Sequence, residues 1–167
     1  SKLEDTKRLY EIVASVKSRA QVNLTGAGHS TAVLRAAAYS SPMAAFQDEM
    51  AGIGYYQFIE KLEKDFEQRK EETVEELCKL MKKILRPENF MISYTGERES
   101  LETVQKLAGA VKAGLGTEPG EKSEEKLTCT KKNEGFKTSG QVQYVAQTGN
   151  FKKKGLEYTG ALEILKV

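Results

Sequence analysis

The chain contains a single histidine, His29, which lies where a helical segment begins and is the first candidate for chemistry. A histidine in this place can serve as a metal ligand, as a catalytic base or as a structural residue. A zinc site needs three or four ligands from His, Cys, Asp or Glu. With one histidine, neither His-Glu-x-x-His nor its inversion, His-x-x-Glu-His, can occur. We therefore expect no metal ligand in the chain, and a structural role for His29, as a cap at the helix start or in packing.

Nucleophilic catalysis would also depend on His29, because a Ser-His-Asp or Cys-His site needs a histidine as its base. The Gly-x-Ser-x-Gly pattern of a nucleophile elbow does not occur in the sequence. Cys78 lies on an apolar helical stripe and Cys129 in an alternating run, without the basic neighbours that activate a thiol. Whether the two cysteines pair stays open. We expect no catalytic residue, so the chain is not predicted to be an enzyme on its own.

Arg35 is the second residue of interest, because it stands on the helical segment 31–40 among otherwise small side chains. Its guanidinium group can pair with Asp48 or Glu49, both of which follow in the next segment. Such a pair would hold that segment against the helix. A solvated arginine is the alternative.

The composition narrows the class of protein. The chain has 167 residues, of which 39% are hydrophobic and 30% charged, with a formal net charge of +2. Acidic and basic residues are interspersed, so we predict no basic face for nucleic acid. No apolar run reaches the roughly 18 residues of a membrane span, and no signal peptide is recognisable. We expect no membrane partner and a reducing compartment, which is the cytoplasm, or an organelle matrix in a eukaryote.

Apolar residues spaced three and four apart predict the amphipathic helices that would position these side chains. The helix of 31–40 is expected to begin at a cap formed by Ser30 or Thr31, after a break caused by the glycines of 23–30. Gly52 is expected to interrupt the next helical stretch. The predicted helices cover 3–20, 31–40, 43–66, 73–85, 100–116 and 158–167.

The sequence also predicts strands, in segments that are compactly apolar or that alternate between apolar and polar residues. These segments are 90–96, 126–132 and 136–147. The predicted fold class is α+β, with several amphipathic helices packed on one face of a small, mainly antiparallel sheet. A polar stretch with proline and glycine, 117–126, predicts a linker between residues 1–116 and 127–167.

The two ends of the chain predict a piece of a longer protein. The sequence begins at Ser1 without a methionine, and it stops inside an apolar run with no signal for the end of a helix. A partial domain would leave sheet edges and helix faces uncovered. We therefore expect self-association of the piece.

Residues 28–66 contain the features of one known family. A Ser-rich break, an acidic stretch and a turn centred on Gly52 follow a His-Ser-x-Ala-x-x-Arg segment. That segment is matched by His29, Ser30, Ala32 and Arg35. In these features the sequence resembles the insulinase and pitrilysin-type (inverzincin) zinc metallopeptidases, in their presequence-protease branch.

Residues 136–167 are similar to the strand, turn and helix that open the fourth domain in that branch. The pattern there is roughly Val-Asn-Tyr-Val-Gly, followed by a tyrosine, a glycine and a leucine. The corresponding residues here are Val142, Tyr144, Tyr158, Gly160 and Leu162. Because both sets of features occur in the same order, the resemblance covers nearly the whole chain.

The resemblance implies a place in a larger fold. Family members have four similar α+β domains that form a clamshell, so residues 1–116 would be the later part of the third domain. Residues 127–167 would be the first strands and the helix of the fourth. The family holds zinc in its first domain, where the metal lowers the pKa of a bound water. No residue of this chain matches those ligands, so zinc would be bound outside these residues.

The resemblance therefore implies a non-catalytic segment from the C-terminal half of a zinc metalloendopeptidase. The segment would form part of the wall of a closed chamber that degrades unfolded peptides, with the remaining domains of the parent chain and the peptide as partners. Six motif positions would be structural: His29, Ser30, Arg35, Gly52, Tyr144 and Gly160. The alternatives are a stand-alone α/β protein-interaction module and an inactive peptidase-like subunit whose partner chain supplies the zinc.

Overall fold

The structure is a computed structural model, and it describes residues 5–116, 126–138 and 140–164. It contains two compact units. The larger unit consists of Lys7–Phe66 and Glu125–Val167, and the smaller unit consists of Ser1–Thr6 and Glu67–Glu124.

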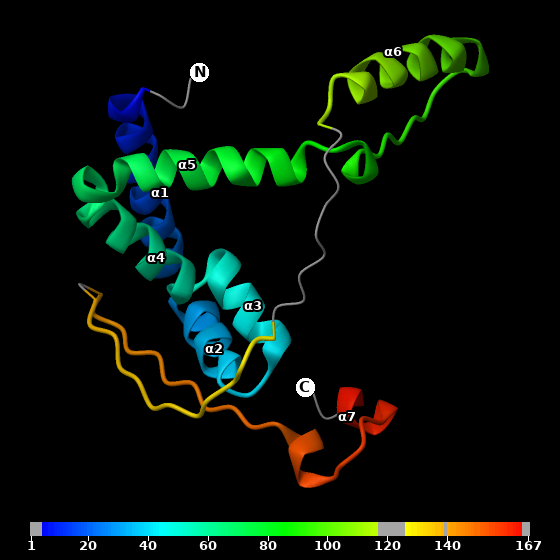
Figure 1. Ribbon diagram of the computed structural model, residues 1–167. Coiled ribbons are helices and arrows are strands. Elements are labelled where there is room, and N and C mark those ends of the chain that lie inside the picture. Colours follow the sequence, from blue (N-terminus) through cyan, green and yellow to red (C-terminus); the bar gives the residue numbers. More distant parts are fainter. Residues whose placement is uncertain (1–4, 117–125, 139, 165–167) are drawn as a thin grey trace. The chain divides into compact units, whose positions relative to one another are not determined.

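Four helices from the N-terminal part of the chain build the larger unit (Figure 1). They are α1 (Thr6–Gly26), α2 (Gly28–Ala38), α3 (Pro42–Ala51) and α4 (Ile53–Lys64). Helix α2 packs against α3, and α3 packs against α4. The C-terminal part of the unit first runs as an extended chain, and then forms the 3₁₀ helix η4 (Phe151–Lys154) and the short helix α7 (Gly160–Ile164).

The predicted break before α2 is much shorter than expected. Only Ala27 separates α1 from α2, because glycine also adopts helical dihedrals and the glycines on either side lie within the helices. Ala27 is the N-cap residue and makes no side-chain hydrogen bond. The predicted cap by Ser30 or Thr31 is therefore wrong. The Thr31 hydroxyl instead donates to the carbonyl oxygen of Leu24, at 3.3 Å.

The corner between α3 and α4 lies at Gly52, which confirms the predicted interruption there. Helix α3 itself begins at a polar cap, because the Ser41 hydroxyl accepts a hydrogen bond from the Ala44 N–H at 3.4 Å. Pro42 occupies the first turn, where a missing N–H has no cost. These two residues explain why the chain leaves α2 and starts a new helix at this point.

The core of the larger unit lies between α1 and the end of α4. Val13, Ile59 and Phe66 are buried together, and Phe66 is only 1% exposed. The ring of Tyr10 lies 5.4 Å from that of Phe66. At the edge of this cluster the Lys17 ammonium donates to the Glu63 carboxylate at 2.5 Å. Packing and the ion pair together fix α1 against α4.

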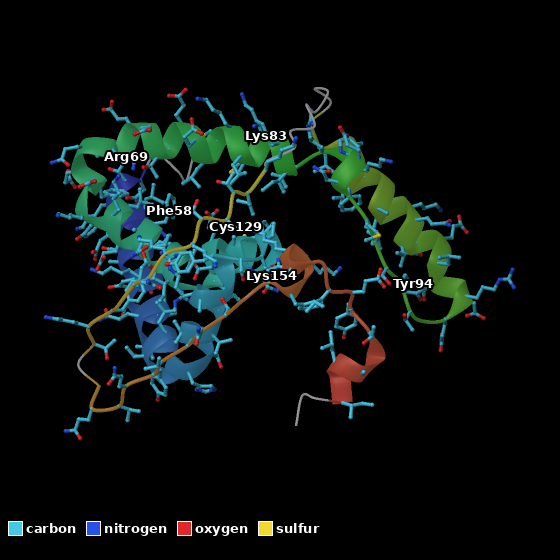
Figure 2. The ribbon with its side chains drawn as sticks, turned by 90° about the horizontal axis from the view of Figure 1, so that it is seen from below. Phe58, Arg69, Lys83, Tyr94, Cys129 and Lys154 are labelled. Carbon is cyan, nitrogen blue, oxygen red and sulfur yellow. The ribbon has the colours of Figure 1, made fainter. Side chains whose placement is uncertain are left out.

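The smaller unit contains two longer helices and two 3₁₀ turns. They are α5 (Phe66–Ile84), η2 (Pro87–Asn89), η3 (Arg98–Ser100) and α6 (Leu101–Ala113). Charged side chains project from α5 along its length, among them Arg69 and Lys83 (Figure 2). After α6, the N–H of Gly116 donates to the carbonyl oxygen of Leu85 at 3.2 Å, which ties the end of α6 to the end of α5.

The predicted α+β class is wrong, because the described residues form helices and irregular segments but no strand and no sheet. The predicted strand 90–96 lies in the open, with Met91 91% exposed. Residues 126–132 and the described part of 136–147 also lack regular structure. A strand obtains its backbone hydrogen bonds from a neighbouring strand, and within the described ranges none of these segments has such a ladder.

The predicted linker, 117–126, lies outside the described residues except for Lys126. The assignment of residues 1–116 and 127–167 to two domains of a parent protein stays a prediction. The last predicted helix is observed as α7, which begins at Gly160; residues 165–167 are again outside the described part.

Candidate functional site

Arg35, in the last turn of α2, is the centre of a charged cluster in the larger unit. Its Nη1 donates to Asp48 Oδ2 of α3 at 2.6 Å, which confirms the predicted pairing with that residue. Its Nε and Nη2 donate to the two carboxylate oxygens of Glu134, at 2.9 and 3.3 Å. The two side edges of the guanidinium fork are thus occupied by two carboxylates from different parts of the chain.

Asp48 connects this cluster to the corner between α3 and α4. Its side chain is 3% exposed, and besides Arg35 it accepts hydrogen bonds from the N–H groups of Ile53 and Gly54, at 3.0 and 3.1 Å. These are the first free donors of α4, where a negative charge is favoured. A Cβ on Gly52 would collide with the Asp48 carboxylate. Gly52 is therefore required by close approach, since its φ of −98° is open to any residue.

Glu134 is the acceptor that brings the C-terminal part of the chain to α2. It takes hydrogen bonds from Arg35 and from the Tyr39 hydroxyl, and it pairs with Lys132. The hydrogen bonds from Arg35, with smaller contributions from Lys132 and Tyr39, outweigh burial and lower the pKa of Glu134 to about 2. Both the charge and the position of this carboxylate are thus set by the cluster.

The partners of Glu134 respond in the same sense. Burial lowers the pKa of the Arg35 guanidinium, but the hydrogen bonds to Glu134 and Asp48 outweigh it and raise that pKa above its ordinary value. Burial, followed by the hydrogen bond to Glu134, raises the pKa of the Tyr39 hydroxyl. The arginine is therefore charged and the tyrosine neutral at physiological pH.

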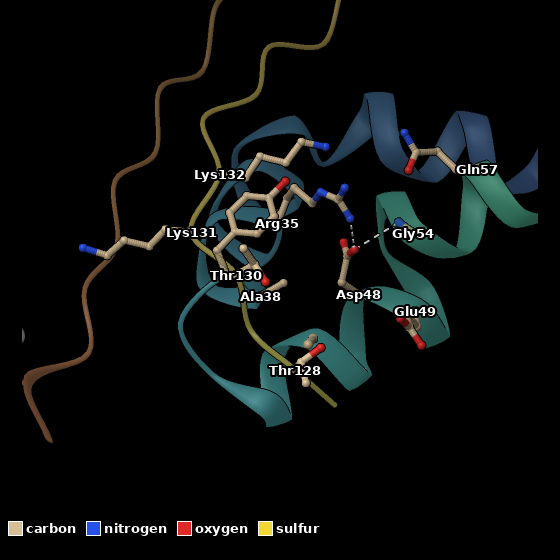
Figure 3. A pocket seen from close by; sticks show the side chains of 12 residues that line it. Arg35, Ala38, Asp48, Glu49, Gly54, Gln57, Thr128, Thr130, Lys131 and Lys132 are labelled. Carbon is tan, nitrogen blue, oxygen red and sulfur yellow. Dashed lines mark hydrogen bonds and ion pairs between the residues drawn. The ribbon is translucent and has the colours of Figure 1, made fainter. Parts of the chain in front are cut away.

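The aromatic rings of Tyr39 and Phe136 complete the surroundings of the arginine. The central carbon of the Arg35 guanidinium lies 5.3 Å from the centre of the Tyr39 ring and 5.9 Å from that of Phe136. Both distances are in the range of cation–π attraction. Lys132, Glu134 and Phe136 alternate along the chain, so an extended backbone presents all three on one side. Figure 3 shows Lys131 on the opposite side, pointing away from the helices.

Residues 126–138 and 140–150, which we call the strap, meet α2 at further points. The Thr148 hydroxyl donates to the carbonyl oxygen of Ala36 at 2.8 Å, and the Asn150 amide donates to that of Ser40 at 2.9 Å. Carbonyl groups at a helix C-terminus have no partner within the helix. The strap therefore supplies donors where the end of α2 needs them.

The other end of α2 meets Tyr144 of the strap. The ring of His29 lies 6.2 Å from that of Tyr144, tilted by 52°. A Cβ on Gly28 would lie 2.5 Å from a carbon of the Tyr144 ring, so glycine leaves the space that the ring uses. His29 thus packs beside an aromatic ring, and the N-cap position belongs to its neighbour Ala27.

The six predicted motif positions do not form one site. Arg35 lies at the charged cluster, Gly52 beside it, and His29 and Tyr144 at the other end of α2. Ser30 is exposed on α2, and Gly160 begins α7. Their role as family positions stays a prediction. Sequence reasoning missed Tyr39, Glu134 and Phe136, for which the alternation around "KNEGF" was the available signal.

A shallow pocket opens beside the cluster, between α2, α3, α4 and the strap (Figure 3). Its polar lining comes mainly from groups that already bind each other, Arg35 and Asp48 among them. In the parts of the chain that the structure describes, no three His, Cys, Asp or Glu side chains are grouped so that they could hold a metal ion. Likewise, no described helix is long and apolar enough to cross a membrane. The chemistry of this arrangement is that of a structural ion-pair cluster.

Comparisons with known proteins place the chain among larger relatives. Residues 1–62 match a family model for the region associated with peptidases of the C subfamily of the insulinase family. The chain is 32% identical, over 98% of its length, to Protein HypA of Clostridium perfringens (strain 13 / Type A). It is 26% identical, over 96% of its length, to Presequence protease 1, chloroplastic/mitochondrial, of Arabidopsis thaliana. The chain spans only 17% and 15% of these two relatives. No solved structure gives a significant match.

Proposed function

Because the chain is related to a segment of insulinase-family peptidases of the C subfamily, as its sequence predicted, we propose that it is a non-catalytic segment of a zinc-dependent metalloendopeptidase. In that protein it would form part of the wall of the closed chamber in which unfolded peptides are degraded. One observation carries the proposal: nearly the whole chain aligns with a short stretch of two much longer proteins, one of which is named a presequence protease.

The geometry of the larger unit supports a scaffolding role. Arg35 and Asp48 join three helices through buried charge, and Glu134 fastens a segment 99 residues away in the sequence to the same point. A chamber that selects substrates by size needs walls that keep their shape, because exclusion of folded proteins is then a matter of geometry. Held charges and filled hydrogen bonds serve rigidity rather than turnover.

Zinc would be bound by residues of the parent chain that are not part of this sequence. There it would lower the pKa of a water molecule and so generate the nucleophile for peptide hydrolysis. The proposed partners are the remaining domains of the parent chain and the peptide substrate. The proposed compartment is the cytoplasm, or an organelle matrix if the source is a eukaryote.

The test begins with the gene on both sides of these 167 codons. We expect an upstream His-x-x-Glu-His motif in the same reading frame. The full-length protein should then cleave an unfolded peptide, lose this activity on chelation, regain it with zinc, and spare a folded protein of the same sequence length. An Arg35→Met variant of the full-length protein should keep its zinc but lose the discrimination against folded substrates.

Two results would overturn the proposal. The first is a reading frame without the zinc motif. The second is a full-length protein that contains the motif and binds zinc but cleaves no peptide. A frame without the motif would leave a protein-interaction module or an inactive subunit as the explanation, and co-purification with a zinc-binding partner chain would then distinguish these two.

A further inference from the structure

The strap is attached to α2 by its side chains. Glu134 binds Arg35 and Tyr39, and Thr148 and Asn150 donate to backbone carbonyl groups at the end of the helix. Between the strap and the described helices of the larger unit, no backbone–backbone hydrogen bond is formed. The helices therefore do not depend on the strap for their backbone hydrogen bonds, and the surface under it is formed by elements that are complete on their own.

That surface has a definite chemical preference. We define the docking face as Arg35, Ala36, Tyr39 and Ser40 with Asp48 behind them. It offers two parallel N–H donors of a guanidinium, one hydroxyl donor and two carbonyl acceptors. Asp48 holds the third edge of the guanidinium, so the fork is oriented before any further carboxylate arrives. A fixed fork of this kind selects a planar carboxylate with geometric precision.

The strap has the complementary pattern. An extended chain with Lys-x-Glu-x-Phe at 132–136 places a carboxylate between a cation and an aromatic ring on one side. The glutamate meets the fork, the phenylalanine lies beside the guanidinium, and the lysine pairs with the same glutamate. Charge complementarity and alternation together specify the register in which such a segment binds.

We propose that the docking face is a binding site for an extended segment of the Lys-x-Glu-x-Phe type, and that it accepts this segment from a second copy of the chain as well as from its own strap. The strap is then an intramolecular ligand. Two copies that exchange their straps form a dimer with the same contacts that each copy has alone. The inference concerns this surface alone and holds whether or not the parent protein is a peptidase.

The test uses the whole 167-residue chain with its own strap detached by Glu134→Lys, which places a cation against Arg35. A fluorescent peptide of residues 126–150, with serine in place of Cys129, is titrated and its anisotropy is recorded. We expect saturable binding, at least about tenfold weaker when the peptide itself carries Glu134→Lys, since a charge-assisted hydrogen bond contributes at least that factor. A peptide with Lys131→Glu, changed on the outward side, should bind as well as the unchanged peptide.

Two further chains serve as controls. The wild-type chain should bind the peptide more weakly than the Glu134→Lys chain, because its own strap competes. Arg35→Met, introduced into the Glu134→Lys chain, should abolish the difference between the two peptides. If circular dichroism shows that the Glu134→Lys chain has lost its helices, the titrations are repeated with Glu134→Gln. Equal binding of the unchanged and the Glu134→Lys peptide, or no binding to a folded chain with a detached strap, would overturn the proposal.

Discussion

Replacement of Arg35 by methionine is the most direct test of the charged cluster. Methionine keeps most of the aliphatic volume of arginine but removes every donor. The change deletes one hydrogen bond to Asp48 and two to Glu134, at a side chain that is only 18% exposed. Both carboxylates then remain in the larger unit without their shared cation.

The magnitude follows from what each carboxylate retains. Removal of one partner from a fully buried pair costs about 3–5 kcal/mol. Asp48 keeps the N–H groups of Ile53 and Gly54, and Glu134 keeps Tyr39 and Lys132, so part of this cost is offset. A hydrogen bond to a charged group contributes roughly 1.5–3 kcal/mol. We therefore expect Arg35→Met to lower the free energy of unfolding by about 2–4 kcal/mol.

Urea denaturation followed by circular dichroism measures this change, and hydrogen exchange of peptides from α2 to α4 locates it. The matched control is Lys106→Met, which removes an exposed pair with Glu102 of α6 that contributes about 0.3–0.5 kcal/mol. A loss for Arg35→Met no larger than that of the control would refute the reasoning, because the cluster would then be a surface pair in its energetics. Protection lost in α5 instead of α2–α4 would refute the assignment of its place.

Three more predictions concern single features. Gly52→Ala should destabilise by about 1–3 kcal/mol in urea, since its Cβ meets the Asp48 carboxylate, whereas Gly109→Ala, at an open position of α6, should stabilise by roughly 0.5–1 kcal/mol. Ser41→Ala should cost about 1 kcal/mol in the same assay through loss of the α3 cap, and an unchanged midpoint would refute that cap. The folded-state pKa of Glu134, about 2, lies below its unfolded value of 4.5. Its contribution is therefore fully present above pH 4.5 and lost as the pH falls towards 2, so the gap in melting temperature between wild type and Glu134→Gln should close over that range and not above it.

The local part of the fold could be predicted from sequence, because helical periodicity and capping depend on residues a few positions apart. The interruption at Gly52 and the pair between Arg35 and Asp48, 13 residues apart, belong to this part. The break before α2 was overestimated for an equally local reason. Glycine permits a left-handed turn but does not impose one, and of the described residues only Gly155 adopts a positive φ.

The strap shows why the fold class was missed. Alternation of period two reports only that one side of an extended chain meets something, and a sheet is the common case. Here Lys132, Glu134 and Phe136 meet a helix and its arginine instead. Glu134 could not be identified as the partner because 99 residues separate it from Arg35, and no local pattern distinguishes it from other exposed glutamates.

The shared use of Arg35 by two carboxylates also sets an order of assembly. Asp48 follows Arg35 by 13 residues and Glu134 by 99, so closing the longer loop costs about 2 kcal/mol more in chain entropy. During synthesis the chain from α2 to the start of α4 is complete long before the strap exists. The near carboxylate can therefore orient the guanidinium while the ribosome is still adding residues, and the late segment arrives at a receptor that has already formed.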